Sequence, residues 1–324
     1  PIAHSRSPGI HARFAEQIAI ALEYRAIEAG VAGFGAALAA FEAGGGLGAN
    51  VTLPLKAEAP RHCKSLSERA QRAGVVNTLS RLDDGGWHGD NTDGIGLVQD
   101  LATRHRQDIR GRRTLVLGAG GAVQGVLVAL LEAGLDSIVI ANRTPARADA
   151  LADRIGEPGR VSTVYWEDLH DAGAFEMVVN GTAAGHQREA LVLPFSLIGR
   201  RAVVYDMNYG RAAIDFLAWG RAAGSEHVYD GAGMLVEQAA EAFERWHGVR
   251  DSLRKHEQLA PVDFCARVRD AVETDAAPSV AAPAPTRVWR AVGGMAIAAG
   301  VAAVALVLGG PVRAPVEEVR VAEA

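Results

Sequence analysis

The sequence predicts an α/β protein in two parts, a doubly wound parallel sheet and a second, smaller α/β unit. Two observations predict the parallel sheet. From residue 111 onward, short apolar strands alternate with helical segments, and a glycine-rich turn separates the first strand from the first helix. The second unit is predicted because residues 1–95 mix helices, strands and turns without that regular alternation.

The composition is that of a globular protein long enough for two hydrophobic cores. Of the 324 residues, 49% are hydrophobic and 22% are charged. The net charge is −5 with both signs spread along the chain, which argues against a nucleic-acid partner. The two cysteines, Cys63 and Cys265, have neither disulfide-framework nor metal-ligand spacing, so we expect no metal and a reducing, cytoplasmic compartment.

The elements of the smaller unit are predicted from helical patterns, caps and turns. Pro54 ends one strand, residues 83–86 form a turn between two others, and Ser65 with Glu68 has the spacing of a capping box. The predicted helices cover residues 13–24, 31–41 and 65–73, and the predicted strands cover residues 48–56, 75–79 and 87–89.

The elements of the larger unit alternate from the start. An apolar strand over residues 113–117 leads through a glycine turn to a helix over residues 124–132. A second strand follows at residues 137–141, and Pro145 stands where a helix tolerates proline best, at its first position. Further strands are predicted at residues 177–180, 202–205 and 227–228.

The glycine turn is predicted to bind the pyrophosphate of a dinucleotide. Glycines let the backbone approach the phosphates, and the following helix offers free N–H groups at its positive end. Val123 occupies the place of the usual third glycine, and a purely structural turn is the alternative. The residues expected to bind the cofactor here are Gly118, Ala119, Gly120, Gly121 and Ala122.

The residues after the next strand, over residues 137–141, indicate whether the cofactor is NAD or NADP. An NAD site usually has a carboxylate there, which binds the ribose 2′-hydroxyl. This chain has Asn142, Arg143 and Thr144 instead, with Arg147 one turn later. Arginines and hydroxyls suit a 2′-phosphate, so the sequence favours NADP over NAD. A solvated surface arginine is the alternative interpretation.

Five further motifs in the first 250 residues resemble those of shikimate dehydrogenases, and they occur in the order of that family. They are His4-Ser5-Arg6-Ser7-Pro8, Asn50-Val51-Thr52-Leu53-Pro54-Leu55-Lys56, Val76-Asn77-Thr78, Gly89-Asp90-Asn91-Thr92-Asp93-Gly94 and Gly231-Ala232-Gly233-Met234-Leu235-Val236 with Gln238-Ala239. The resemblance implies a Rossmann-type NADP domain, a substrate domain, and reversible NADPH-dependent reduction of 3-dehydroshikimate to shikimate in aromatic amino acid biosynthesis.

The resemblance also implies the roles of individual residues. Lys56 and Asp93 are the implied catalytic pair, and proton transfer by such a pair contributes about 10²–10⁴ in rate. His4 and His11 lack a partner cluster and are given no role. The implied shikimate-binding residues are Ser5, Ser7, Asn50, Thr52, Lys56, Asn77, Asp93, Tyr209 and Gln238. The residues implied on the nicotinamide side of the cofactor are Thr182, Met207, Gly231 and Met234.

The sequence departs from the family pattern at two places. The family's first strand has no counterpart before Pro1, so the substrate sheet is expected to have an unpaired edge. Val123-Gln124 replaces a small-then-basic pair, which is expected to weaken binding of the cofactor phosphates.

The last 75 residues resemble a different family. Residues 246–310 are similar to the segment around the membrane helix of the membrane-bound negative regulator of the sigma-E factor. Residues 291–310 have no charged or polar side chain and are long enough for a transmembrane helix, which would tether the enzyme to the inner membrane. A buried or disordered alanine-rich tail is the alternative.

The expected organisation follows from these motifs. Shikimate and 3-dehydroshikimate are the expected small-molecule partners. A homodimer is an open alternative for the oligomeric state. The expected parts are a substrate domain at residues 1–95 completed by 232–250, an NADP domain at 96–231, a linker at 251–290, a transmembrane helix at 291–310 and a tail at 311–324.

Three alternative functions are kept. The first is a quinate/shikimate dehydrogenase of broader specificity, which the absence of an NAD-directed carboxylate disfavours. The second is a truncated, inactive, membrane-tethered binding protein. The third is a regulator fragment, which the missing sigma-binding helices disfavour.

Overall fold

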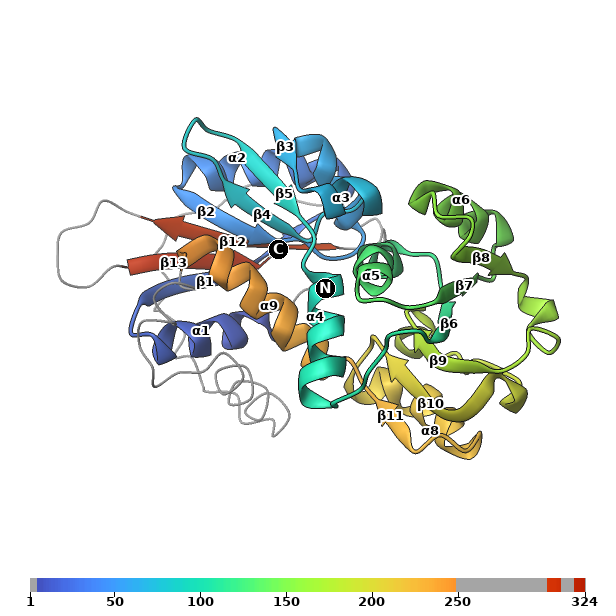
Figure 1. Ribbon diagram of the computed structural model, residues 1–324. Helices are drawn as coiled ribbons and strands as arrows, with labels where there is room; N and C mark the ends of the chain where they lie inside the picture. Colours follow the sequence, from blue (N-terminus) through green and yellow to red (C-terminus); the bar gives the residue numbers. More distant parts are fainter. Residues whose placement is uncertain (1–4, 249–301, 310–317, 324) are drawn as a thin grey trace.

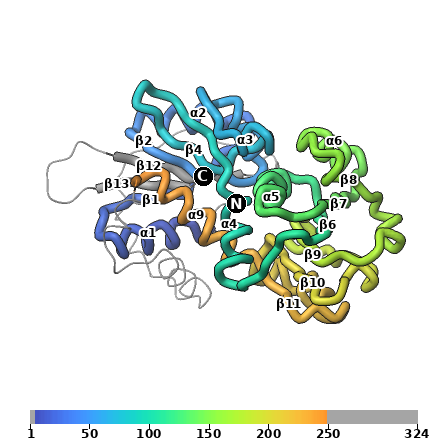
Figure 2. Tube along the Cα trace, in the orientation of Figure 1, coloured from blue at the N-terminus to red at the C-terminus, as the bar shows by residue number. Residues whose placement is uncertain are grey.

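A computed structural model describes residues 5–248, 302–309 and 318–323. A six-stranded and a four-stranded sheet lie on opposite sides of the molecule, and helices α4 (Asp93–Gln99), α5 (Gly121–Glu132) and α9 (Ala232–His247) lie between them (Figure 1). The chain runs through the first sheet, crosses to the second, and returns along α9 (Figure 2). The predicted α/β class is confirmed.

The larger sheet is parallel throughout and has the strand order β11-β10-β9-β6-β7-β8. From β6 the chain adds β7 and β8 on one side, and it then adds β9, β10 and β11 on the other side. The direction in which strands are added therefore reverses between β6 and β9. In such sheets, ligands bind outside the carboxyl ends of the strands at that reversal. The strands are β6 (Arg113–Leu117), β7 (Ser137–Ala141), β8 (Val161–Val164), β9 (Phe175–Asn180), β10 (Ile198–Asp206) and β11 (His227–Tyr229).

Alternate side chains of these strands enter two separate cores. Val116 and Ile140 pack with α5 and with α6 (Pro145–Ile155) on one face of the sheet. Leu117 and Val139 pack on the other face with Phe216 of α8 (Ile214–Ala222). Both faces are covered, which explains why the strand sequences are almost continuously apolar.

The smaller sheet has the strand order β2-β4-β5-β3, antiparallel except between β3 and β5. It lies beside helices α2 (Phe34–Ala43) and α3 (Glu68–Ala73) (Figure 1). Phe34, Leu38 and Phe41 of α2 pack into its core. Its strands are β2 (Gly46–Asn50), β3 (Ser65–Leu66), β4 (Thr78–Arg81) and β5 (Trp87–Asp90).

Helix α9 carries the chain back to the first sheet. Val236, Ala239 and Phe243 pack against Ile10 and Phe14 of α1 (Ser7–Gln17). Helices α9 and α4 approach closely, because a methyl carbon on Gly96 would lie 2.7 Å from the backbone nitrogen of Gln238. Helix α9, which follows the larger sheet in sequence, therefore packs against α1 and α4, which precede that sheet.

Two helix predictions in the first unit are wrong at their ends. The predicted helix over 13–24 stops at Gln17, and residues 21–29 form strand β1 (Ala21–Ala29). Its Ala, Leu and Glu residues favour helix, but pairing with other strands overrides that weak preference. Ser65 begins β3, and the N-cap of α3 is Ser67, whose hydroxyl accepts the backbone N–H of Ala70 at 3.2 Å.

Several short elements were not predicted. They include α4, β8, α7 (Ala184–Gln187) and a π-helical turn at Asp100–Arg104. The 3-10 turns are Val31–Gly33, Leu55–Ala57, Ala59–His62, Trp166–Asp168, Phe195–Leu197 and Gly210–Ala213.

The predicted transmembrane helix is not found at residues 302–309, which form strand β12 (Ala302–Gly309). β12 pairs antiparallel with β1, and β13 (Glu318–Glu323) pairs parallel with β1 and antiparallel with β12, so these three strands form a closed group of their own. The sequence predicts an unpaired edge in the substrate sheet, and β2 stands at the edge of the four-stranded order. An apolar segment with valines, as at Val304 and Val307, can form a strand where a neighbouring strand offers backbone partners. No helix of the described residues is long and apolar enough to cross a membrane. Residues 291–301, the linker at 251–290 and most of the sigma-regulator resemblance lie outside the described residues.

Candidate active site

Lys56 and Asp93 form a buried ion pair. Lys56 lies on the turn after β2, and Asp93 is the first residue of α4. Lys56 Nζ donates to Asp93 Oδ2 at 2.6 Å, and the two residues are only 9% and 4% exposed. A buried charge pair is retained at a cost in desolvation, so its presence in a fold points to a chemical role.

A hydrogen-bond network fixes the free oxygen of Asp93. Asn77 Nδ2 donates to Asp93 Oδ1 at 2.8 Å and to Gln238 Oε1 at 3.3 Å. The backbone N–H of Thr92 donates to Asn77 Oδ1 at 2.8 Å, and the Thr92 hydroxyl donates to the Gln238 carbonyl at 3.0 Å. Four predicted site residues, Lys56, Asn77, Asp93 and Gln238, therefore meet at one point, and Thr92 joins them although it was not predicted.

The helix that follows the glycine turn reaches this point. A methyl carbon placed on Gly125 of α5 would lie 2.8 Å from Asp93 Oδ2. One placed on Gly121 would lie 3.5 Å from Cβ of Lys56. The absence of side chains at these two positions allows α5 to pack directly against the Lys56–Asp93 pair.

The glycine turn has the shape of a phosphate cradle. Gly118 follows β6 with φ of +108°, which favours glycine, and Gly120 is the N-cap of α5 without a side-chain cap. A methyl carbon on Gly120 would contact nothing within 4 Å, so space is open beside the free helix end. Gln124 Nε2 donates back to the Ala119 carbonyl at 3.2 Å, and Ala122 is the second residue of the helix. These features fit a bound dinucleotide.

The predicted 2′-phosphate residues follow β7 at the same sheet edge. Arg143 is exposed, and its Nη1 lies 2.8 Å from Glu189 Oε2. Asn142 Nδ2 donates to the Thr144 carbonyl at 2.9 Å and so closes the loop that leads into α6. Arg147 lies in the first turn of α6. No carboxylate occupies the end of β7 itself.

A second network orders the loops after β9 and β10. Asp206 accepts hydrogen bonds from the Asn208 backbone at 2.9 Å and from Asn180 Nδ2 at 3.1 Å. Asn180 Oδ1 accepts from the hydroxyl of Thr182 at 2.8 Å. Burial raises the pKa of Asp206 to about 6. The sequence assigns Asp206 no role, although its place at the end of a buried strand, at the edge of the sheet where ligands bind, could have indicated that it orders these loops.

The remaining predicted residues lie at the starts of α1 and α9, at the end of β2 and on the loops after β2 and β10. Met207 follows Asp206, and a methyl carbon on Gly231 would lie 2.3 Å from the Met207 carbonyl oxygen. Met234 is buried where α9 meets the core beneath α4. The Ser7 backbone donates to Ser5 Oγ at 3.2 Å at the start of α1. Asn50 is the last residue of β2 and is partly buried. Thr52 is exposed on the turn after β2, and Tyr209 is partly buried on the loop after β10.

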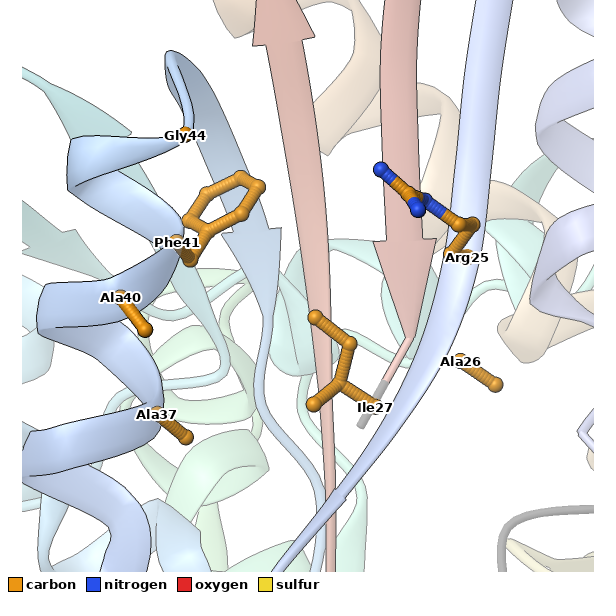
Figure 3. Close-up of a pocket in the computed structure, with 7 residues that line it drawn as sticks. All are labelled: Arg25, Ala26, Ile27, Ala37, Ala40, Phe41 and Gly44. Atoms are coloured by element: carbon orange, nitrogen blue, oxygen red, sulfur yellow. The ribbon is translucent and has the colours of Figure 1, made fainter. Parts of the chain in front are cut away.

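One cavity lies apart from these residues. It has a volume of about 600 Å³ between α2 and β1, and its lining includes Phe41 of α2 and Ile27 of β1, whose side chain points toward α2 (Figure 3). Its lining contains none of the predicted site residues. Within the ranges that the structure describes, no three His, Cys, Asp or Glu side chains are grouped to hold a metal ion.

Three family models match the chain in order. They are a shikimate dehydrogenase substrate binding domain at residues 1–79, a shikimate/quinate 5-dehydrogenase domain at residues 100–188 and a shikimate 5′-dehydrogenase C-terminal domain at residues 231–251. Together these matches include the glycine turn and the Lys56, Asn77 and Gln238 positions.

Known proteins agree with these matches. A shikimate dehydrogenase (NADP(+)) of Xanthomonas campestris is 57% identical over 274 residues, which are 84% of this chain and 94% of the relative. The structure of an Ael1 enzyme from Pseudomonas putida has a TM-score of 0.72 at 42% identity and covers 77% of this chain and 91% of that one. A shikimate 5-dehydrogenase from Thermus thermophilus, solved with NADP(H) and shikimate, has a TM-score of 0.68 at 32% identity and covers 84% and 96%.

Proposed function

The chain belongs to the shikimate dehydrogenase family, and from that premise we propose how its own residues carry out the family reaction. It is an NADP-dependent oxidoreductase that interconverts 3-dehydroshikimate and shikimate. The observation that carries the assignment of roles is the buried Lys56–Asp93 pair, at 2.6 Å, against the helix that begins at the glycine turn.

Lys56 donates and accepts the proton that the reaction requires, and Asp93 positions Lys56. Reduction adds a hydride to the carbonyl carbon, and NADPH supplies that hydride when it is bound. The carbonyl oxygen then needs a proton, which Lys56 donates from Nζ; in the oxidation direction the same nitrogen accepts it. Asp93 holds the ammonium group by the hydrogen bond at Oδ2, while Asn77 fixes the other oxygen of the carboxylate. Positioned proton transfer of this kind contributes about 10²–10⁴ in rate.

The cofactor site is divided between two loops. The turn at Gly118, Gly120 and Gly121 holds the pyrophosphate at the positive end of α5, where space is open. Arg143, with Thr144 and Arg147, holds the 2′-phosphate, because its planar guanidinium matches phosphate oxygens. Arg143 must exchange Glu189 for the phosphate when the cofactor binds.

The substrate shell surrounds the ion pair. Shikimate has a carboxylate and three hydroxyls, which need several small polar side chains at fixed positions. Asn77 and Gln238 already lie in the network around Asp93. We place the other contacts at Ser5, Ser7, Asn50, Thr52 and Tyr209.

The two-domain division is also a proposal. Residues 1–95 with 232–250 form the substrate domain, and residues 96–231 form the NADP domain. The two sheets and the return of α9 to α1 support this division. Closure between the domains would exclude water from the hydride transfer.

We place the enzyme in the cytoplasm and assign residues 302–309 to the group of strands around β1 rather than to a membrane tether, because β12 pairs with β1 along six residues. We propose separately, from the sequence, that the protein forms a homodimer. Sedimentation of the full chain tests this proposal directly.

The function is tested by NADPH oxidation with 3-dehydroshikimate on the full chain, followed by absorbance. We expect turnover with NADPH and much slower turnover with NADH. Quinate with NADP is assayed in parallel, since oxidation of quinate at a similar rate would favour the broader specificity. A folded protein that binds NADPH without turnover would overturn the proposal in favour of a binding protein.

A further inference from the structure

A fully buried carboxylate, Asp206, ties together the loops that follow two neighbouring strands of the larger sheet. Its Oδ1 accepts hydrogen bonds from the backbone N–H of Asn208 at 2.9 Å and from Asn208 Nδ2 at 2.8 Å. Its Oδ2 accepts from Asn180 Nδ2 at 3.1 Å. Asp206 and Asn180 are the last residues of β10 and β9, so the carboxylate joins the points where the chain leaves these two strands.

The donors around Asp206 require that both of its oxygens accept hydrogen bonds. The backbone N–H of Thr182 donates to Asn180 Oδ1 at 3.0 Å, and a backbone N–H can only donate. The oxygen of the Asn180 amide therefore faces Thr182, and its NH₂ group faces Asp206. On the other side, Asn208 presents a second backbone N–H. An ionised carboxylate satisfies both sides, whereas an amide would turn its own NH₂ group toward one of these donors.

Asn208 extends the network to a third loop. Asn208 Nδ2 donates to the Thr182 carbonyl at 3.0 Å as well as to Asp206, so both of its N–H groups are used within the protein. The Asn208 carbonyl accepts from the backbone N–H of Gly231, which follows β11, at 2.9 Å. The loops after β9, β10 and β11 are therefore held in one arrangement.

These three loops border the turn that is proposed to hold the cofactor phosphates. A methyl carbon on Gly118 of that turn would lie 3.1 Å from the Gly181 carbonyl oxygen, on the loop after β9. The residues expected on the nicotinamide side, Thr182, Met207 and Gly231, all lie on the three loops. Strands β9 and β10 lie on the opposite side of β6 from β7, whose loop is proposed to bind the 2′-phosphate. The network thus lies at the nicotinamide end of the cofactor site.

We propose that Asp206 is a positioning residue for the reaction, because its carboxylate fixes the loops that place the nicotinamide ring of NADP. This inference rests on the proposed function, which gives the chain its NADP site. Asp206 acts through Asn180 and Asn208. Loops that are not held in place have the binding arrangement in only a fraction of the molecules, and the affinity for the cofactor falls by that fraction.

Protonation of Asp206 would disrupt the same network, because a carboxyl O–H would then face a donor. Burial raises the pKa of Asp206 to about 6, and the charge of Asp230, on the loop after β11, adds to this rise. The loop after β9 brings the uncharged Asn180 and Thr182 to this region, and the start of α9 brings Gly231. Asp206 is therefore mostly ionised at about pH 7.5 and mostly protonated at about pH 5.5.

Asp206→Asn tests the proposal through the binding of two ligands to the full chain. NADP reaches both ends of the cofactor site, whereas adenosine 2′,5′-bisphosphate, the adenosine half of NADP, reaches only one. By titration calorimetry at about pH 7.5, we expect the variant to raise Kd for NADP about 3- to 10-fold, the effect of one hydrogen bond, and Kd for the bisphosphate less than about 2-fold.

Asp108→Asn is the matched control. Asp108 also accepts the backbone N–H of the residue two positions later, Arg110, at 3.1 Å, but it precedes β6 and so lies at the opposite end of the strands. Its Kd for NADP should equal that of the unaltered chain. Equal losses of both ligands in Asp206→Asn, or an unchanged Kd for NADP, would overturn the inference.

The pH dependence separates the charge of Asp206 from its packing. Phosphate groups titrate in the same range, so the quantity to compare is the Kd for NADP of Asp206→Asn divided by that of the unaltered chain. This ratio should shrink at least about 2-fold between about pH 7.5 and pH 5.5, because the unaltered chain then loses the same charge. A ratio that stays constant or grows contradicts the role of the carboxylate.

Urea unfolding shows whether each variant is folded. If Asp206→Asn does not fold, Asn208→Ala decides, because it keeps the carboxylate and removes the link to Thr182. It is expected to weaken NADP binding and to leave the bisphosphate unchanged, and equal effects on both ligands would overturn the inference. These binding measurements need no turnover. The proposed function fails separately, if the unaltered chain does not oxidise shikimate with NADP.

Discussion

At the scale of single residues, Lys56 is the most direct test of the mechanism. Lys56→Ala removes the proposed proton donor and leaves Asp93 without its ion-pair partner. We expect turnover to fall about 10²- to 10⁴-fold while NADPH affinity stays within about 3-fold, because the phosphate-binding turn is untouched. Steady-state kinetics and NADPH fluorescence titration measure the two quantities.

Lys64→Ala is the control for that variant, since Lys64 is also a lysine paired with a carboxylate, Asp84, but at the surface. It should behave like the unaltered chain. Unchanged turnover in Lys56→Ala would remove Lys56 from the mechanism.

We expect Arg143 to determine the preference of the enzyme for NADPH over NADH. Arg143→Ala is expected to weaken NADPH binding about 10- to 100-fold, the range for hydrogen bonds to a charged group, and to change NADH binding little. Glu189→Gln should tighten NADPH binding, because Glu189 competes with the 2′-phosphate for Arg143. Titration of both cofactors measures the effect, and Arg110→Ala, at another exposed arginine paired with a carboxylate, is the control. Equal losses for NADPH and NADH would contradict the assignment.

The sequence predicts the residues that chemistry constrains and misses those that act through neighbours. Lys56, Asp93 and Asn77 belong to short motifs, and the structure brings these side chains together. His11 is 39 positions from Asn50 and has no cluster of titratable partners, so the sequence assigns it no role. Only the folded chain shows that the two side chains meet.

At the scale of elements, α5 is the link between the cofactor turn and the ion pair. Gly125→Ala would put a methyl carbon 2.8 Å from Asp93 Oδ2, so the helix or the carboxylate must shift. We expect turnover to fall at least about 10-fold, because displacement of a reacting group by a fraction of an ångström is costly, with a stability loss of about 1–3 kcal/mol.

Gly159→Ala is the matched control, because a methyl carbon there would meet nothing within 4 Å. It should leave both turnover and the urea midpoint nearly unchanged. Full activity of Gly125→Ala would show that α5 and the Lys56–Asp93 pair are not tightly coupled.

The elements that the sequence predicts best are the ones defined by their own pattern. Strands β6, β7, β9 and β10 are apolar and follow a regular alternation, so they can be read locally. Strand β1 has helix-favouring residues and exists because β12 and β13 pair with it. Its state depends on residues far along the chain, at 302–309 and 318–323, which no local pattern contains.

At the scale of the whole molecule, buried titratable groups set the response of stability to acid. Desolvation lowers the pKa of His11 to about 3 and that of His247 to about 4, from the ordinary value of 6.5. Between these lowered values and pH 6.5, the unfolded chain therefore binds more protons than the folded chain. That difference lowers stability as the pH falls. Asp206, with its pKa raised to about 6, binds its proton more readily in the folded chain and opposes the trend between pH 6 and 3.8.

Two histidines lower the stability of the folded chain as the pH falls and one aspartate raises it, so the net effect of acid is a loss of stability. We expect the free energy of unfolding to decrease by on the order of 1 kcal/mol per pH unit between about pH 6 and pH 4. Urea unfolding at about pH 7, 6 and 5 measures it, and His247→Gln should reduce the slope. A midpoint that stays constant or rises on acidification would show that desolvation does not lower the pKa values of the two histidines.

The return of α9 to α1 has a consequence for the order in which the protein forms during synthesis. Ile10 and Phe14 leave the ribosome early, but the apolar face that covers them, Val236 to Phe243, is made after the whole nucleotide-binding sheet. At about 5–20 residues per second, the wait is roughly 10 to 50 seconds. During that interval the nascent chain exposes an apolar surface that a chaperone would cover, while the parallel sheet, whose strands are contiguous in sequence, can fold first.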